Sequence, residues 1–195
     1  MDEGGQVPPR EMAGHSGTFD NVTVPAGRTC RLQNATVQGN VKALENSELY
    51  VSNTTVRGDV QGDEARIVQV TGGRVDGNIQ IGDATSPGQL GAAVTGGTVV
   101  TGGDIQIKKM RTGSVVIVDA RVNAGNIQVE ENSTSERLEI RANQVGGNLQ
   151  VFKNTGAGQK IVQGNTVSQS LQCKENSPPF TGTPNTAGER EDQCR

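Results

Sequence analysis

Glutamine is the residue type whose spacing first suggests ligand chemistry in this sequence. Six glutamines occupy the same position of a repeated segment, at Gln61, Gln80, Gln106, Gln128, Gln150 and Gln172. A side-chain amide both donates and accepts hydrogen bonds, so a row of amides could contact a ligand. Stacked amides also bond to one another along a sheet, and this structural ladder is the favoured interpretation of the row.

Three carboxylates on adjoining repeats are the candidate metal ligands. Asp63, Glu64 and Asp83 lie just past the glutamine positions, and carboxylate oxygens are the ligands that Ca²⁺ prefers. Their spacing matches no known calcium-binding loop. Charges of changing sign follow at the same place in later repeats, at Lys108, Lys109, Glu130 and Glu131. Exposed ion pairs between repeats are the favoured interpretation, so we predict no bound metal and no cofactor.

Hydrolytic or lyase chemistry has little support in the residue types. Such enzymes need clustered carboxylates beside a groove flanked by long loops. The one long insertion, 84–91, carries no ionisable side chain, and His15 is the only histidine. No Gly-x-Ser-x-Gly elbow is present either. We therefore predict no catalytic residues and keep a polysaccharide-active lyase or hydrolase as the alternative.

The elements that must position these residues are repeats of about 20 residues. The clearest copy is Val145-Gly-Gly-Asn-Leu-Gln-Val151. Residues equivalent to its Asn148 are Asn21, Asn40, Asp59, Asn78, Asp104, Asn126 and Ser170, separated by 19, 19, 19, 26, 22, 22 and 22 residues. A period near 20 with one short strand at a fixed place is typical of a solenoid.

Apolar residues alternate with polar ones after each of these positions. The first apolar column is Val22, Val41, Val60, Ile79, Ile105, Ile127, Leu149 and Leu171. The second is Val24, Ala43, Gly62, Ile81, Ile107, Val129, Val151 and Cys173. Alternation with a period of two places these columns inside a parallel sheet and the glutamine row outside.

Two further sets of apolar residues complete each repeat. One set predicts a second strand row, from Leu32, Leu49, Val51, Val68, Val70, Val116, Val118, Leu138, Ile140 and Ile161. The other predicts a short third row, from Val37, Val56, Val75, Val122 or its neighbour, Val145 and Val167. Three strands in each turn of 19–26 residues predict an all-β fold. We expect a single-stranded right-handed parallel β-helix of about eight coils.

Asparagine recurs at the expected corners of the coils. Asn40, Asn78, Asn126 and Asn148 can each bond the backbone of a neighbouring coil and form a structural ladder. Two further columns are expected, one of Asn34, Asn53, Asn143 and Asn165 and one of Asn46, Asn132, Asn154 and Asn176. The insertion at 84–91 is expected to bulge outward as a loop, because corners tolerate extra residues and strands do not.

The ends of the chain differ from the repeats. We expect an N-terminal arm or cap over 1–16, the β-helix over 17–176 and a proline-rich C-terminal cap over 177–195, with Phe180 as its lid. Proline cannot extend a strand ladder, and the open end of a solenoid must be covered. A bridge between Cys173 and Cys194 would fix this cap to the last coil, and three free thiols are the alternative.

Composition excludes several classes of partner. The formal net charge is −3, with 18 basic and 21 acidic residues intermixed, so no basic surface for nucleic acid is expected. No apolar run approaches the roughly 18 residues that cross a bilayer, so we predict no membrane insertion. No signal peptide is present in this chain, which is compatible with its removal from a secreted precursor. We expect a monomer.

Two resemblances extend this interpretation. The segment Leu171-Gln-Cys-Lys-Glu-Asn-Ser-Pro-Pro179, with Gly147-Asn-Leu-Gln-Val151 before it, resembles a group of small secreted bacterial β-helix proteins of unknown function. This resemblance implies export and the Cys173–Cys194 bridge, and it implies no activity. The family's first cysteine is replaced in His15-Ser-Gly-Thr18, so Cys30 lacks its expected partner. A weaker likeness is to bactofilins, which are cytoplasmic β-helices that polymerise.

Together these features predict a non-enzymatic, secreted β-solenoid. It would serve as a rigid scaffold or as a module that binds an extracellular glycan or a cell-surface component. A polysaccharide-active enzyme and a self-assembling, bactofilin-like filament are the two alternatives. A cytoplasmic location is the alternative to secretion.

Overall fold

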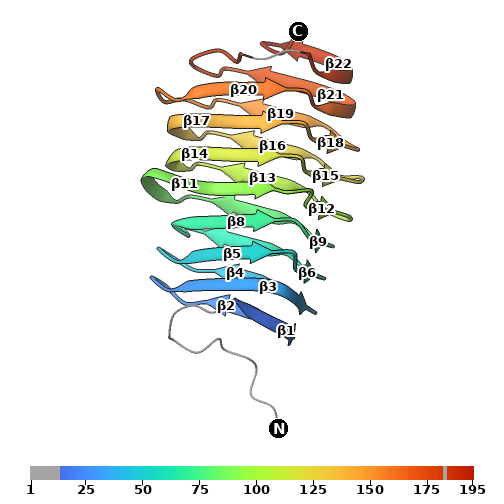
Figure 1. The fold of residues 1–195 in the computed structure, drawn as a ribbon. Helices are drawn as coiled ribbons and strands as arrows, with labels where there is room; N and C mark the ends of the chain where they lie inside the picture. Colours follow the sequence, from blue (N-terminus) through green and yellow to red (C-terminus); the bar gives the residue numbers. More distant parts are fainter. Residues whose placement is uncertain (1–13, 182–183) are drawn as a thin grey trace.

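The structure is a computed structural model that describes residues 14–181 and 184–195. Its 22 strands stack into a rod with β1 and β22 at opposite ends (Figure 1). Neighbouring strands are parallel throughout the pairings, and no helix occurs within 14–181 or 184–195. The chain is therefore an all-β parallel β-helix of about eight coils, as the repeats predicted.

Each coil contributes strands to three rows. Row one contains β2 (Val22–Val24), β4 (Val41–Ala43), β7 (Val60–Asp63), β10 (Ile79–Gly82), β13 (Ile105–Lys108), β16 (Ile127–Glu130), β19 (Leu149–Phe152) and the second half of β21 (Thr166–Lys174). Row two contains the first half of β3 (Thr29–Val37), β5 (Glu48–Ser52), β8 (Ile67–Thr71), β11 (Thr85–Thr95), β14 (Arg111–Val118), β17 (Ser133–Arg141) and β20 (Gln159–Gln163).

Row three is made of shorter strands. It contains β1 (His15–Phe19), the second half of β3, β6 (Thr55–Val56), β9 (Arg74–Val75), β12 (Val99–Val100), β15 (Arg121–Val122), β18 (Gln144–Val145) and the first half of β21. The last strand, β22 (Thr186–Asp192), pairs with β21 between Thr166 and Cys173, with an irregularity between Val167 and Ser170.

The register of row one confirms the predicted alignment. Val22 pairs with Val41, Ile79 with Ile105, and Leu149 with Leu171, each in the expected first column. Every residue of both apolar columns is buried. The glutamine column between them lies on the outer face, because adjacent side chains of a strand point to opposite sides of the sheet.

Row two departs from the expected assignment in two coils. Val115 and Ile117 face the core in place of Val116 and Val118, and they pair with Leu138 and Ile140. The run Val115–Val118 is apolar throughout, so no alternation marks its inward face. In the last coil the inward residues are Lys160 and Val162, and Ile161 faces outward.

Row three confirms its six predicted valines and adds Val100, which pairs with Val75 and Val122. All of them are buried. The sequence gives no sign which of Val99 and Val100 faces inward, because both are valine.

Both corners that flank row two turn through a residue with positive φ. Between rows one and two these are Gly27, Asn46, Glu64, Asp83, Lys109, Glu131, Lys153, Glu175 and Asp192. Between rows two and three they include Asn34, Asn53, Asp119, Ala142 and Gly164. The next residue along the chain is the buried corner position: the first corner runs Ser47, Ala65, Ala84, Met110, Asn132, Asn154 and Asn176, and the second includes Ala35, Thr54, Ala120, Asn143 and Asn165.

The two predicted asparagine columns at these corners are therefore wrong in the N-terminal coils. Asn34, Asn46 and Asn53 occupy the exposed positive-φ position, one residue before the buried position of Asn132 and Asn143. Asparagine is favoured in both places, since it tolerates positive φ and also bonds well inside a ladder. The residue type alone could not distinguish them.

The insertion at 84–91 is mostly strand, which corrects the expected outward loop. β11 begins at Thr85, and its pairing with β14 is irregular between Ser86 and Ala92. The hydroxyl of Ser86 donates to Thr112 Oγ1 at 3.0 Å, and the backbone N–H of Gly91 donates to the same atom at 3.0 Å. Pro87 and Gly88 are exposed, and the register shifts between Ser86 and Ala92 show that bulges in a long strand absorb the extra length.

The C-terminal cap extends the stack by one charged strand. Cys173 and Cys194 are joined by a disulfide, as predicted, and Cys30 is a buried free thiol. In β22, Arg190 and Asp192 pair with Leu171 and Cys173, so charged residues replace the two inward apolar columns. Phe180, Ala187 and Cys194 pack against the last apolar layer. The apolar core therefore ends at β21.

At the other end, the predicted arm over 1–16 lies largely outside the described residues, and β1 begins at His15. Phe19 packs against the first coil of the core. Within the described part of the chain, no helix is long and apolar enough to cross a membrane.

Candidate functional site

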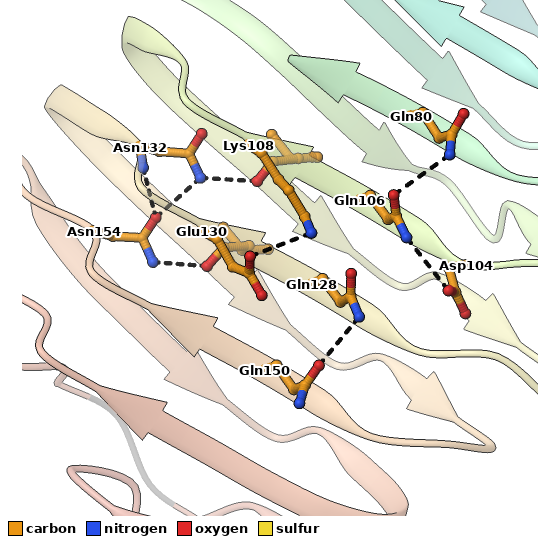
Figure 2. Close-up of polar contacts among 11 residues, drawn as sticks. Gln80, Asp104, Gln106, Lys108, Gln128, Glu130, Asn132, Gln150 and Asn154 are labelled. Atoms are coloured by element: carbon orange, nitrogen blue, oxygen red, sulfur yellow. Dashed lines mark hydrogen bonds and ion pairs between the residues drawn. The ribbon is translucent and has the colours of Figure 1, made fainter. Parts of the chain in front are cut away.

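The outer face of row one carries the six glutamines and is here named the amide face. Their side chains are half-buried, because each lies against the glutamine of the next coil. Figure 2 shows Gln128 donating from Nε2 to Oε1 of Gln150 at 3.2 Å. The chain of amides continues from Gln150 to Gln172 at 3.0 Å and ends on Glu191 of β22 at 3.0 Å. This part of the row is a closed ladder.

The row is interrupted in the middle of the rod. Gln80 donates to Gln106 at 3.4 Å, but Gln106 Nε2 turns to Asp104 Oδ2 at 3.5 Å instead of reaching Gln128 (Figure 2). Beside the interruption, Lys108 Nζ lies 3.2 Å from Glu130 Oε2. The predicted ladder is therefore present in two segments.

An asparagine and aspartate ladder forms one border of the amide face. The backbone N–H of each predicted ladder residue donates to the side-chain oxygen one coil earlier, as in Asn40 to Asn21 at 2.9 Å and Asn148 to Asn126 at 2.8 Å. Asp59 and Asp104 fill the same role between the asparagines. A carboxylate oxygen accepts an N–H as readily as an amide oxygen does, so the ladder continues through both residue types.

A shallow depression of about 350 Å³ lies on the amide face near its N-terminal end. It exists because Gly82 has no side chain between Asp63 and Lys108, its in-register neighbours on the adjoining coils. Gln61, Gln80 and Gln106 line one side, together with Lys42. A side chain at position 82 would fill the depression.

Several polar groups in the depression are free of partners. The amide of Gln61 makes no hydrogen bond with the described residues, in contrast to the other five glutamines. Asp63 and Lys42 are exposed and form no ion pair within 14–181 or 184–195. The depression therefore offers one amide, one carboxylate and one ammonium group to a ligand.

The three candidate calcium ligands are not brought together. Asp63 pairs in register with Gly82, Glu64 occupies a positive-φ corner, and Asp83 lies 3.9 Å from Lys109. Asp83 shares a corner hollow with Glu131, Lys109 and Arg111, so the two carboxylates of the hollow lie among two basic side chains and not beside Asp63 or Glu64. The described residues contain no group of three or more His, Cys, Asp or Glu side chains that could hold a metal.

One residue of the amide face escaped the sequence interpretation. Phe152 follows the inward Val151 in β19, so it faces outward next to Gln150, and it is half-buried. It pairs with Glu130 of the preceding coil and Lys174 of the next. The alternation of β19 already contained this signal, since an aromatic residue in an outward position needs a reason other than the core.

The β-helix implied by the resemblance to small secreted proteins is present, and the resemblance itself remains an expectation. Neither a known family model nor a curated protein or solved structure matches this chain.

Proposed function

We propose that the protein is a non-enzymatic, exported rod that binds a glycan or another polar surface component through its amide face. The observation that carries this proposal is the depression at Gly82, where the glutamine row stays open and the Gln61 amide lacks a partner among the described residues. A buried or half-buried amide normally has its hydrogen bonds satisfied, so an open one at a depression is a place for ligand hydroxyl groups.

The types of group around the depression suit a sugar. Sugar hydroxyls both donate and accept hydrogen bonds; a glutamine amide can do both in return, and a carboxylate accepts from them. Gln61, Gln80 and Asp63 supply such groups within one depression. Small-molecule sites commonly combine a concave surface with a few convergent polar groups.

Binding without turnover is the better-supported form of this proposal. Glycoside hydrolysis requires a pair of carboxyl groups across the scissile bond, or a comparable acid and base. Asp63 is the only carboxylate lining the depression. His15 lies in β1 of row three, away from the amide face.

The cap supports export and a monomeric state. Disulfides form and persist mainly in oxidising, extracellular environments, so the Cys173–Cys194 bridge favours secretion over the cytoplasmic alternative. Filament growth would need an open apolar coil end. The exposed β22 instead presents Glu189, Arg190 and Asp192, and charges on an edge strand oppose pairing with another chain.

A panel of purified neutral and acidic polysaccharides tests the proposal by biolayer interferometry, with reducing-end and unsaturated-product assays on the same mixtures. We expect binding without product. The double variant Gln61→Ala/Asp63→Ala should weaken it, and Gln144→Ala on row three should not. Absence of binding to every glycan would overturn the proposal, and product release would replace it with an enzyme. Filaments in electron micrographs, in place of isolated short rods, would overturn the monomer.

A further inference from the structure

Phe152 is a partly exposed aromatic residue that the core does not use. The other phenylalanines, Phe19 and Phe180, pack against the ends of the apolar core. Phe152 instead lies on the amide face beside Gln150, whose own amide is held by Gln128 and Gln172. A half-buried ring on the outer face of a polar sheet is a surface on which the apolar side of a sugar can stack.

The ring and the depression belong to one column of the amide face. Gly82, Lys108, Glu130 and Phe152 follow one another in register on consecutive coils. Three steps of about 4.8 Å separate the first from the last, so the depression and the ring lie about 14 Å apart along the rod axis. The glutamine row runs parallel to this column over the same coils.

The charges between the two places cancel. Lys108 and Glu130 pair at 3.2 Å (Figure 2), and they occupy the two register positions between Gly82 and Phe152. On the two flanks, Asp63 precedes Gly82 in this column, with Lys42 beside it in register with Gln61, and Lys174 follows Phe152. A polyanion along this column would have to displace Glu130 or lie against its charge, which a neutral ligand avoids.

We propose that the ligand is a neutral, linear glycan that lies along the rod axis. One sugar occupies the depression at Gly82, another stacks on Phe152, and those between them contact the Lys108–Glu130 pair and the glutamine amides. This inference rests on the proposed glycan-binding function and specifies its ligand class and direction. One sugar of an extended chain advances about as far as one coil, so about four units span both places.

Isothermal titration calorimetry with cello-, chito- and malto-oligosaccharides of two to six units tests the inference, with oligogalacturonates as the acidic series. In the neutral series that binds, affinity should rise with length and level off near four or five units. Phe152→Ala should weaken the longer oligomers about five- to tenfold and leave disaccharide binding in the depression unchanged. Phe152→Tyr should retain affinity. The control is Gln144→Ala, and melting curves should show all variants folded, because Phe152 faces outward.

The outcomes separate this inference from the function on which it rests. Tighter binding of oligogalacturonates would overturn the neutral ligand and leave glycan binding standing. Equal affinity for disaccharide and hexasaccharide, or indifference to Phe152→Ala, would overturn the two-point arrangement and again leave glycan binding standing. Failure of every oligosaccharide and polysaccharide to bind would overturn both.

Discussion

The N-terminal and C-terminal halves of the rod fill the same buried corners with different chemistry. In the N-terminal half the first corner holds Ser47, Ala65, Ala84 and Met110, and the second holds Ala35, Thr54 and Ala120. In the C-terminal half the same corners hold Asn132, Asn154 and Asn176, and Asn143 and Asn165. The alanines and Met110 only fill the space, and Ser47 and Thr54 bond to backbone atoms close by, whereas each buried amide needs several partners.

The asparagines find those partners in one another. Asn154 Oδ1 accepts from the backbone N–H and from Nδ2 of Asn132, at 3.1 and 2.9 Å. Its Nδ2 donates to Val129 O at 2.8 Å and to Asn176 Oδ1 at 2.9 Å. Figure 2 shows the preceding rung, between Asn132 and Asn154. All the capacity of this side chain is used, so the buried amide is fully satisfied.

A ladder of this kind needs a last acceptor, and the cap supplies two. Gln193 Oε1 accepts from the N–H and Nδ2 of Asn176, both at 2.9 Å. Asn185 Oδ1 accepts from the same groups of Asn165, at 3.0 and 2.9 Å. The difference between the halves is therefore one of dependence: the C-terminal coils rely on the cap for their hydrogen bonds, and the N-terminal coils do not.

Removing one rung should have the largest effect. Asn154→Leu removes the acceptor of the Asn132 N–H and of one Asn132 Nδ2 hydrogen, and it removes the Nδ2 donor to Val129 O and Asn176 Oδ1, so we expect the free energy of unfolding to fall by roughly 3 kcal/mol or more. The matched change in the other half, Ala65→Gly, removes only one buried methyl group and should lower it by about 1 kcal/mol. Urea unfolding measures both. Equal losses would remove the distinction between the two kinds of corner.

Removing the disulfide should destabilise the C-terminal half of the rod more than the N-terminal half. Cys194→Ser frees a segment closed over 21 residues, and we expect about 3 kcal/mol less stability. Hydrogen exchange should quicken in β19, β20 and β21, whose ladders end in the cap, and stay slow in β5 and β8. Uniform quickening along the rod would contradict the dependence on the cap.

The buried Lys160 should make the stability of the C-terminal half depend on pH. Lys160 continues the column of Cys30 and Leu49, is 1% exposed, and donates from Nζ to Gly156 O at 3.0 Å and Gly158 O at 3.3 Å. Burial lowers the pKa of its ammonium group. The unfolded chain, with an ordinary pKa near 10.4, then binds more protons than the folded one between the two values.

Stability of the parent protein should therefore rise with pH across that interval. Relative to the parent, Lys160→Met should be most favourable below the lowered pKa, and its relative advantage should shrink as the pH approaches 10. Thermal unfolding of both proteins from pH 7 to pH 10 measures the difference. A difference that stays constant with pH would mean that burial does not perturb this lysine.

The smallest effect is expected from lengthening the ladder. Met110 already donates its backbone N–H to Asn132 Oδ1 at 2.9 Å, so Met110→Asn would add a rung that faces Ala84. Lost apolar burial and gained hydrogen bonds oppose each other, and we expect a net change within about 1 kcal/mol. Ala65→Asn, with no asparagine on either side, should cost more. The reverse order would show that rungs act singly.

The sequence allowed row one to be predicted residue by residue, because its two buried columns flank a polar one in almost every coil. The prediction failed where that contrast was missing. The run Val115–Val118 offers four apolar residues, and Lys160 hides an inward position behind a charged residue type. A lysine stem is apolar for most of its length, so burial of the stem with the ammonium on backbone carbonyls is physically sound.

The candidate site was predictable only in part. The glutamine row followed from spacing, but its interruption beside Lys108 and Glu130 depends on side-chain conformation, which spacing does not encode. The depression could be inferred in retrospect from Gly82, where neighbouring coils carry Asp63 and Lys108. The asparagines were misplaced because one residue type suits two adjacent corner positions with different burial.

The in-register stacking of equal coils also bears on how such a protein changes over generations. From Asp104 to Ser170 the repeat keeps a spacing of 22 residues, and each coil meets only the one before and the one after. Loss or duplication of one whole unit by recombination would shift the rod's length by about 4.8 Å and leave both ends intact. Length is thus a property that can vary in discrete steps, independently of the sequences that begin and end the rod.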